Sequence, residues 1–146
     1  MARPTPAYPS ASDWPGKRVG LPDTGPRSVG RFGRRLAGVA IDWSIALLVS
    51  VIVFGYDLGA RTTESNVWLT PTIFALLQMV MIPLASGSIG HLLVGLRVVP
   101  ITGGWVGVWR PAVRTVLLCL VIPAVIWNKD QRGVHDLAAG TVLVRR

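Results

Sequence analysis

The chain has 146 residues, of which 51% are hydrophobic, and its mean hydropathy is +0.50. Soluble domains are rarely so apolar, so the composition indicates a small integral membrane protein with room for one membrane domain and one tail. The net charge of +8 suits an anionic membrane surface better than nucleic acid, because the basic residues do not cluster on one soluble segment. The single cysteine, Cys119, excludes an intramolecular disulfide.

The N-terminal segment, residues 1–30, contains six of the eleven prolines and few large aliphatic side chains. Such a segment buries too little apolar surface to offset the entropy lost on ordering. We therefore expect residues 1–30 to be a disordered, proline-rich cytoplasmic tail, followed by a membrane domain over residues 31–146. The first apolar run begins too far behind this tail to be a signal peptide, and we interpret it as a retained anchor.

The first apolar run covers residues 36–54 and contains one acid, Asp42. At about 1.5 Å per residue the run is roughly 28 Å long, which predicts a transmembrane helix. On a helix, four small or polar residues recur at every fourth position and share a face with Arg35. They are Gly38, Asp42, Ala46 and Ser50. Small side chains let membrane helices approach closely, so we expect this face to contact another helix.

Asp42 is the residue that the membrane domain must accommodate, because an unpaired charge in lipid costs several kcal/mol. We expect a buried ion pair between Asp42 and an arginine. The candidates are Arg35 on the same helix and Arg97, Arg110 and Arg114 from later segments. The alternative is a carboxylate that exchanges a proton during transport.

A second span is predicted over residues 67–84, which are uncharged and contain Gln78. Pro71 falls in its first turn and Pro83 near its end, where proline is tolerated or terminates a helix. Gln78 is expected either to hydrogen-bond a neighbouring helix or to contribute a ligand to a transport pathway.

The glycine-rich stretch that follows predicts a small β element. Residues 96–99 and 105–106 flank a Thr-Gly-Gly turn, which favours a local hairpin. Residues 141–144 form a second β-branched run, so we also predict that 96–99 and 141–144 lie on one side of the membrane and pair as strands.

The third apolar segment, residues 111–128, contains Arg114 one turn from its start and Pro123 in its middle. Seven basic residues precede the first span and one lies in the first loop, so the positive-inside rule places the N-terminus in the cytoplasm. Three full crossings would leave the basic C-terminal end outside, against that rule. A segment that re-enters the same face would return it inside, and both topologies stay open.

Several motifs together resemble the RDD family of small bacterial membrane proteins, which is named for one arginine and two aspartates. Those three match Arg35 (or Arg34), Asp42 and Asp136 here. The other matching features are the segment 90–99, the paired Arg110 and Arg114, and the closing segment 135–142. The resemblance covers about residues 31–146 and implies a multi-pass protein of the bacterial plasma (inner) membrane. His91 stands where the family usually has Lys or Arg, so charge at this position would depend on pH.

These patterns predict an all-α membrane protein of about three transmembrane or re-entrant helices with a small cytoplasmic β-hairpin. The expected intramembrane polar site consists of Arg35, Asp42, Gln78, Arg97, Arg110, Arg114, His135 and Asp136. A structural alternative for Asp136 is a cap on a helix that begins at Leu137. The two histidines, His91 and His135, lack a third ligand at useful spacing, so we expect no metal site and no cofactor.

Two functional hypotheses follow from this site. The first is proton- or cation-coupled transport by an oligomer, since three helices are too few to enclose a path; the family resemblance likewise implies a transport role. The second is a non-catalytic accessory or scaffold subunit that binds a larger membrane complex through its stripe of small residues. No nucleophile elbow, phosphate loop or zinc motif is present in the sequence, so we do not expect an enzyme.

Overall fold

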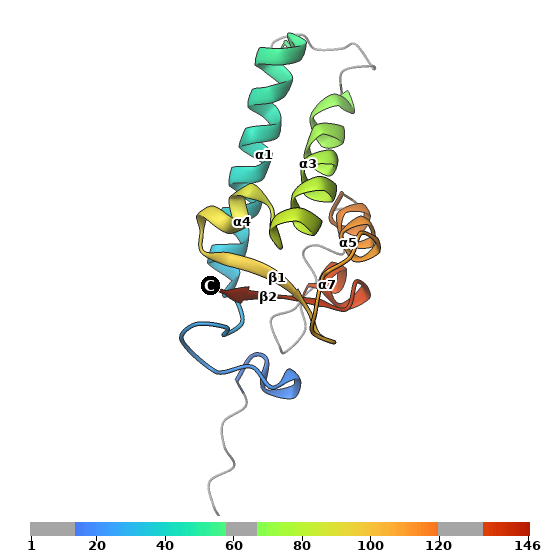
Figure 1. The fold of residues 1–146 in the computed structure, drawn as a ribbon. Coiled ribbons are helices and arrows are strands. Elements are labelled where there is room, and N and C mark those ends of the chain that lie inside the picture. Colours follow the sequence, from blue (N-terminus) through green and yellow to red (C-terminus); the bar gives the residue numbers. More distant parts are fainter. Residues whose placement is uncertain (1–13, 58–66, 120–132) are drawn as a thin grey trace, which may run out of the picture.

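The computed structural model describes residues 14–57, 67–119 and 133–146 (Figure 1). This part of the chain forms five α-helices, one 3-10 helix and two strands. In chain order they are η1 (Lys17–Val19), α1 (Phe32–Phe54), α3 (Leu69–Ala85), α4 (Ile89–Leu93), β1 (Leu96–Pro100), α5 (Trp109–Cys119), α7 (Val134–Ala138) and β2 (Thr141–Arg145). The protein is therefore mostly helical, as predicted.

Helices α1 and α3 run in opposite directions and rise together from a base that contains the sheet and the shorter helices (Figure 1). Among the described residues, α1 alone is both long and apolar enough to cross a membrane, with 23 residues and a mean hydropathy of 2.3 over an 18-residue stretch. Helix α3 is apolar but has 17 residues. In the third predicted span, α5 ends at Cys119, and the remainder of that span lies outside the described residues.

The predicted stripe on the first helix is the face that α1 buries. Its buried residues are Arg35, Gly38, Asp42, Ala46 and Ser50. Helix α3 packs on this face, with Ile73 and Phe74 against Ala46. Two polar contacts flank this apolar contact, since Thr70 Oγ1 donates to Ser50 Oγ at 3.0 Å and Gln78 Nε2 donates to Asp42 Oδ2 at 3.0 Å. The spacing from Asp42 to Ser50 equals that from Thr70 to Gln78, as two antiparallel helices require.

The two strands pair antiparallel, from Leu96 opposite Arg145 to Pro100 opposite Thr141. The expected local hairpin around residues 102–104 is therefore wrong, and the expected pairing of 96–99 with 141–144 is confirmed. Gly103 and Gly104 have φ values of 75° and 81°, and the chain continues from them toward α5 instead of returning as a strand. Val106 is instead buried in the inner core, in a cluster with Ile82 and Leu143.

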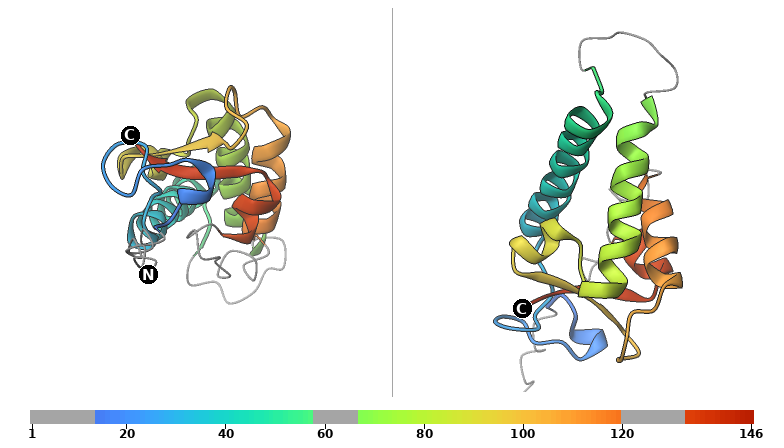
Figure 2. Two further views of the ribbon diagram at one scale, coloured as in Figure 1. Left: turned by 90° about the horizontal axis from the view of Figure 1, so that it is seen from below. Right: turned by 45° about the horizontal axis from the view of Figure 1, so that its top comes forward.

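Residues 14–30 are ordered along the sheet, so the expectation of disorder up to residue 30 does not hold for them. Val29 forms a β-bridge with Val144, and Gly30 N donates to Leu143 O at 2.8 Å. Figure 2 shows from below how the segment that carries η1 lies across β2. Composition gave no sign of this order because the stabilising contacts join residues far apart in the sequence. Residues 1–13 lie outside the described part.

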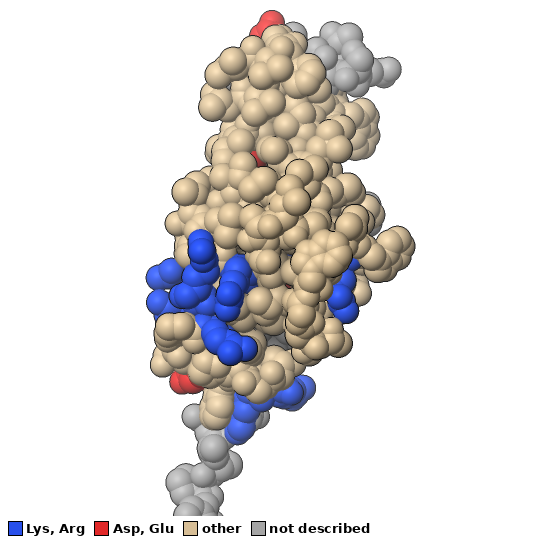
Figure 3. All heavy atoms as spheres, in the orientation of Figure 1, with Lys and Arg blue, Asp and Glu red and all other residues tan. Residues whose placement is uncertain are grey.

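The sheet separates two apolar cores. Its inner face contributes Leu96, Val98 and Leu143, which pack with Ile82 and Val106. Its outer face contributes Val99, Val142 and Val144, and Val29 and Leu21 from the N-terminal segment pack against it. Lysine and arginine gather around the level of the sheet, whereas the upper part of the visible face is almost free of charge (Figure 3).

Candidate functional site

Asp136 is fully buried in α7 at the base of the helices. Its Oδ2 lies 2.7 Å from Arg35 Nη1, and its Oδ1 lies 3.3 Å from Arg114 Nη1. His135 Nε2 is 3.7 Å from the same Oδ1. Two arginines from α1 and α5 therefore converge on one carboxylate from α7 and tie three helices together.

Arg35 also connects this cluster to the sheet. Its Nε donates to Gly30 O at 2.7 Å, and its Nη2 donates to Leu143 O at 3.3 Å. Burial alone would raise the pKa of Asp136, but the positive charges of Arg114 and Arg35 hold the pKa below its ordinary value. Asp136 is thus a permanent carboxylate. Its expected role as a cap of a helix that begins at Leu137 is wrong, because α7 begins at Val134 with Gly133 as its N-cap.

Asp42 occupies the second polar cluster, in the middle of the α1 stripe. Gly90 N donates to its Oδ1 at 2.7 Å, whereas Gln78 Nε2, at 3.0 Å, and Ser88 Oγ donate to its Oδ2. All three donors are neutral. The expected arginine partner is absent among the described residues, since Arg35 and Arg114 pair with Asp136. Arg114 acts on Asp42 only through space.

The backbone amide of Gly90 reaches Asp42 because α4 crosses α1 at two glycines. A Cβ on Gly90 would lie 2.0 Å from Gly38 O and 3.0 Å from Asp42 Cγ, distances that only glycine permits. A Cβ on Gly38 would lie 3.2 Å from the His91 ring. The position of Gly38 in the predicted small-residue stripe thus has a specific cause, the docking of α4.

Ser88 links Asp42 to His91. Ser88 is the N-cap of α4, and its Oγ contacts both Asp42 Oδ2 and His91 Nδ1. A carboxylate is the stronger acceptor, so the hydroxyl proton points to Asp42 and Nδ1 of the neutral ring donates to Oγ. Burial and the positive charge of Arg114 lower the pKa of His91 to about 3, which keeps the ring neutral near pH 7. A chain of three groups results: His91, Ser88 and Asp42.

Several buried polar atoms of the described residues have no hydrogen-bond partner. They include Gln78 Oε1, His91 Nε2, Arg114 Nε and Thr115 Oγ1. Interiors usually satisfy such groups, and exceptions concentrate at functional sites. These atoms belong to the same side chains, or to neighbours of the side chains, that hold the two aspartates.

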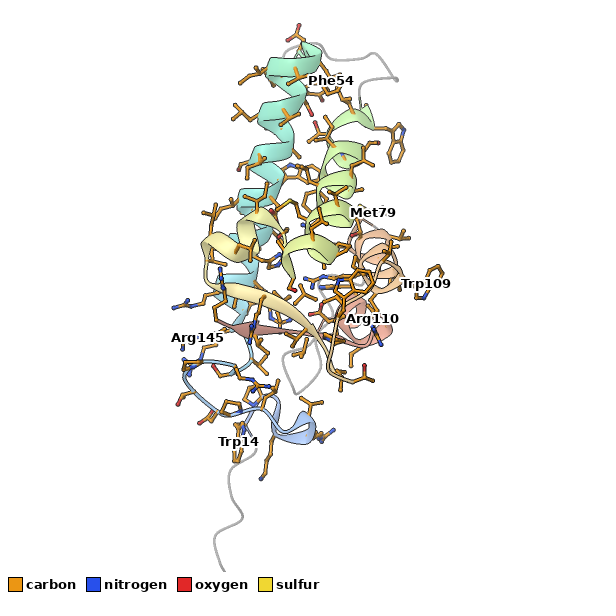
Figure 4. The ribbon with its side chains drawn as sticks, viewed as in Figure 1. Trp14, Phe54, Met79, Trp109, Arg110 and Arg145 are labelled. Atoms are coloured by element: carbon orange, nitrogen blue, oxygen red, sulfur yellow. The ribbon has the colours of Figure 1, made fainter. Side chains whose placement is uncertain are left out.

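The structure brings six of the eight predicted polar residues into the two clusters. Arg97 and Arg110 lie elsewhere. Arg97 is on β1, and Arg110 donates from Nη2 to Thr102 Oγ1 at 3.3 Å near the surface. Figure 4 shows Arg110 at the base beside α5, at the opposite end of the sheet from Arg145. Gln78 bonds a neighbouring helix, as one of its two interpretations predicted.

Sequence reasoning missed Ser88 and the amide of Gly90 as the ligands of Asp42. The available signal was the Ser-x-Gly-His sequence of residues 88–91, in which a serine N-cap and a glycine open a short helix. No group of three or more His, Cys, Asp or Glu side chains within the described ranges is arranged to hold a metal ion.

Comparison with known proteins gives one positive finding. A family model described as the RDD family matches residues 29–140, which is most of the chain and includes both aspartate clusters. Searches of curated proteins and of solved structures find no match.

Proposed function

The chain belongs to the RDD family and is a membrane protein of that family, and on this premise we propose a transport-related role in which Asp42 takes up and releases a proton or a monovalent cation. The observation that carries the proposal is the difference between the two buried aspartates. Asp136 is neutralised by two arginines, whereas Asp42 receives only neutral donors. A buried carboxylate without a cation is costly, and a proton or a small cation removes that cost.

The three-group chain supplies a route for the proton. A proton that arrives at His91 Nε2 allows the Nδ1 proton to pass to Ser88 Oγ, and the hydroxyl proton of Ser88 then passes to Asp42. One proton enters and one reaches the carboxylate, and the imidazole ends neutral. His91 Nε2 is buried and has no partner among the described residues, so it is the accepting end of this chain.

The distribution of charge on the surface supports one arrangement in the membrane. We propose that α1 and α3 cross the bilayer with the sheet and the N-terminus in the cytoplasm. The visible face is apolar over the helices and basic near the sheet (Figure 3). Exposed side chains on the two helices include Leu48, Ile52, Leu76, Val80 and Leu84. Two crossing helices enclose no path, so the proposal includes an oligomer in which these faces meet lipid or other subunits.

Flux into liposomes that contain only the purified full-length protein tests this role. A pH-sensitive dye trapped inside would report proton movement driven by an imposed gradient of sodium or potassium. We expect flux from the parent protein, no flux from Asp42→Asn, and at least a tenfold slower flux from Ser88→Ala. Ser88→Thr retains the hydroxyl and should restore most of the rate.

Asp57→Asn is the matched control, because this carboxylate is exposed just beyond the end of α1. Its flux should equal that of the parent. Parent flux no greater than that of empty liposomes, or undiminished flux from a folded Asp42→Asn protein, would contradict the proposal.

The second candidate is a non-catalytic accessory subunit. It is favoured by the saturated coordination of Asp42, which three donors hold as they would hold a purely structural carboxylate. The stripe of small residues is occupied by α3 and α4 of the same chain, so a partner would contact the exposed apolar faces instead. A protein that co-purifies at a fixed ratio in mild detergent, with no flux from liposomes, would select this candidate.

A further inference from the structure

Arg97 is left without a role by the two aspartate clusters. On β1 its neighbours Leu96 and Val98 face the inner core, so its side chain lies on the outer face of the sheet beside Val99, Val142 and Val144. No hydrogen bond reaches its buried Nε from any part of the chain that the structure describes. An arginine on an apolar sheet face is costly unless a counter-charge binds it.

A cavity of about 280 Å³ opens beside Arg97, between the outer face of the sheet and the N-terminal segment. Its lining includes Leu21, Arg27, Arg97, Val99, Val142 and Val144. Two of these described side chains are cationic and none is acidic. The walls combine two guanidinium groups with apolar surface from both strands, and this combination suits an anion with a small apolar body.

Arg27 reaches this cavity from a strained backbone position. Its φ is 66°, and only one other described non-glycine residue, Ser86, has a positive φ. The strained turn is fixed by the hydrogen bond from Arg27 N to Arg145 O at 2.9 Å. Glycine would adopt this conformation without strain, yet the sequence has an arginine there.

We propose that this cavity binds a phosphate monoester, with the phosphate between Arg27 and Arg97 and the organic part against Val99, Val142 and Val144. Guanidinium groups match phosphate oxygens in pairs, which lysine cannot do. The site is separate from the aspartate clusters and does not depend on the transport proposal. The N-terminal segment that bounds this cavity lies below the sheet, on the side away from Phe54 at the end of α1 (Figure 4).

The chemistry allows two sources of the phosphate, a soluble metabolite and a phosphatidate headgroup. Calorimetric titration of the full-length protein in detergent with phenyl phosphate tests the soluble source. A parallel titration with inorganic phosphate, which has no apolar body, measures how much the apolar walls of the cavity contribute to the affinity. Nanodiscs with and without phosphatidate test the lipid source. We expect phenyl phosphate to bind at least tenfold more tightly than inorganic phosphate.

Two variants separate binding from folding. Arg97→Met keeps the apolar stem and removes a half-buried charge from an apolar sheet face, so the melting temperature should be equal or higher. Arg27→Gly relieves the positive φ and should also preserve stability. Each should weaken phenyl phosphate binding at least tenfold. Arg31→Gln is the control, because Arg31 is exposed just before α1 and does not line the cavity.

Several results would overturn the proposal. One is that no phosphate probe binds at a concentration on the order of 10 mM. The others are an equal loss of phenyl phosphate affinity in Arg31→Gln and an unchanged affinity in both cavity variants. Binding confined to phosphatidate nanodiscs, and lost in Arg97→Met, would support the site and assign the phosphate to a lipid headgroup.

Discussion

The two buried aspartates place the same side chain in two different environments within one small domain. Asp136 lies between Arg35 and Arg114 at the base, whereas Asp42 lies higher on α1 among a backbone amide, an amide side chain and a hydroxyl. Both are buried, yet only Asp136 has a cation in contact among the described residues. The difference indicates that Asp136 joins three helices through its two arginines, and it is the basis of the proposal that Asp42 changes its charge state.

The largest expected effect comes from Asp136→Asn. This change leaves Arg35 and Arg114 buried without a counter-charge, which costs roughly 3–5 kcal/mol of unfolding free energy. Thermal unfolding in detergent at pH 7 measures the loss.

Asp42→Asn is the matched comparison and should cost only about 1 kcal/mol of unfolding free energy. The new amide can donate to Gln78 Oε1, which has no partner within the described residues, and its carbonyl can still accept from Gly90 N. Equal losses for the two variants would refute the distinction.

A smaller effect is expected from Gly90→Ala, which pushes α4 away from α1 and withdraws the amide from Asp42. The added Cβ would meet Gly38 O at 2.0 Å, so the backbones must separate, at a cost of about 1–3 kcal/mol. Thermal unfolding of this variant measures the cost. Gly33→Ala is the control, because nothing lies within 4 Å of a Cβ there and alanine favours the helix. A Gly90→Ala protein as stable as Gly33→Ala would show that the glycine crossing is not tight.

At pH 7 the smallest effect is expected from His91, because its ring is largely neutral in both the folded and the unfolded chain, and this effect grows as the pH falls. The folded pKa is about 3, below the ordinary value of 6.5, so the unfolded chain binds the proton first. The stability that comes from a neutral, buried ring is complete above pH 6.5 and is lost as the pH falls toward 3. The slope is at most about 1.4 kcal/mol per pH unit.

His91→Asn tests this slope, because its amide nitrogen can still donate to Ser88 but does not titrate. Melting temperatures between about pH 4.5 and 6.5 should fall less steeply with acid for the variant than for the parent. If the melting temperatures of the parent and the variant fall equally with acid, another group is responsible for the pH dependence of stability.

The sequence was sufficient for the features that depend on local pattern. Every-fourth-residue spacing identified the buried face of α1 from Gly38 to Ser50, and apolar length identified α1 and α3. The β-branched runs identified both strands, and of the two pairings predicted for residues 96–99 the one with residues 141–144 is correct. The motifs identified the family, which the match over residues 29–140 confirms. These features follow from periodicity and propensity, which neighbouring residues determine.

Only the tertiary structure decided which charges meet. Arg35 shares a helix face with Asp42, but the two are about 10 Å apart along the axis, and Arg35 binds an aspartate 101 residues away instead. The order of residues 14–30 and the outward position of Arg97 have the same origin, because both depend on how β2 returns to β1. Ion pairs and strand contacts are set by distances through space, and a linear pattern does not contain those distances until the chain has closed on itself.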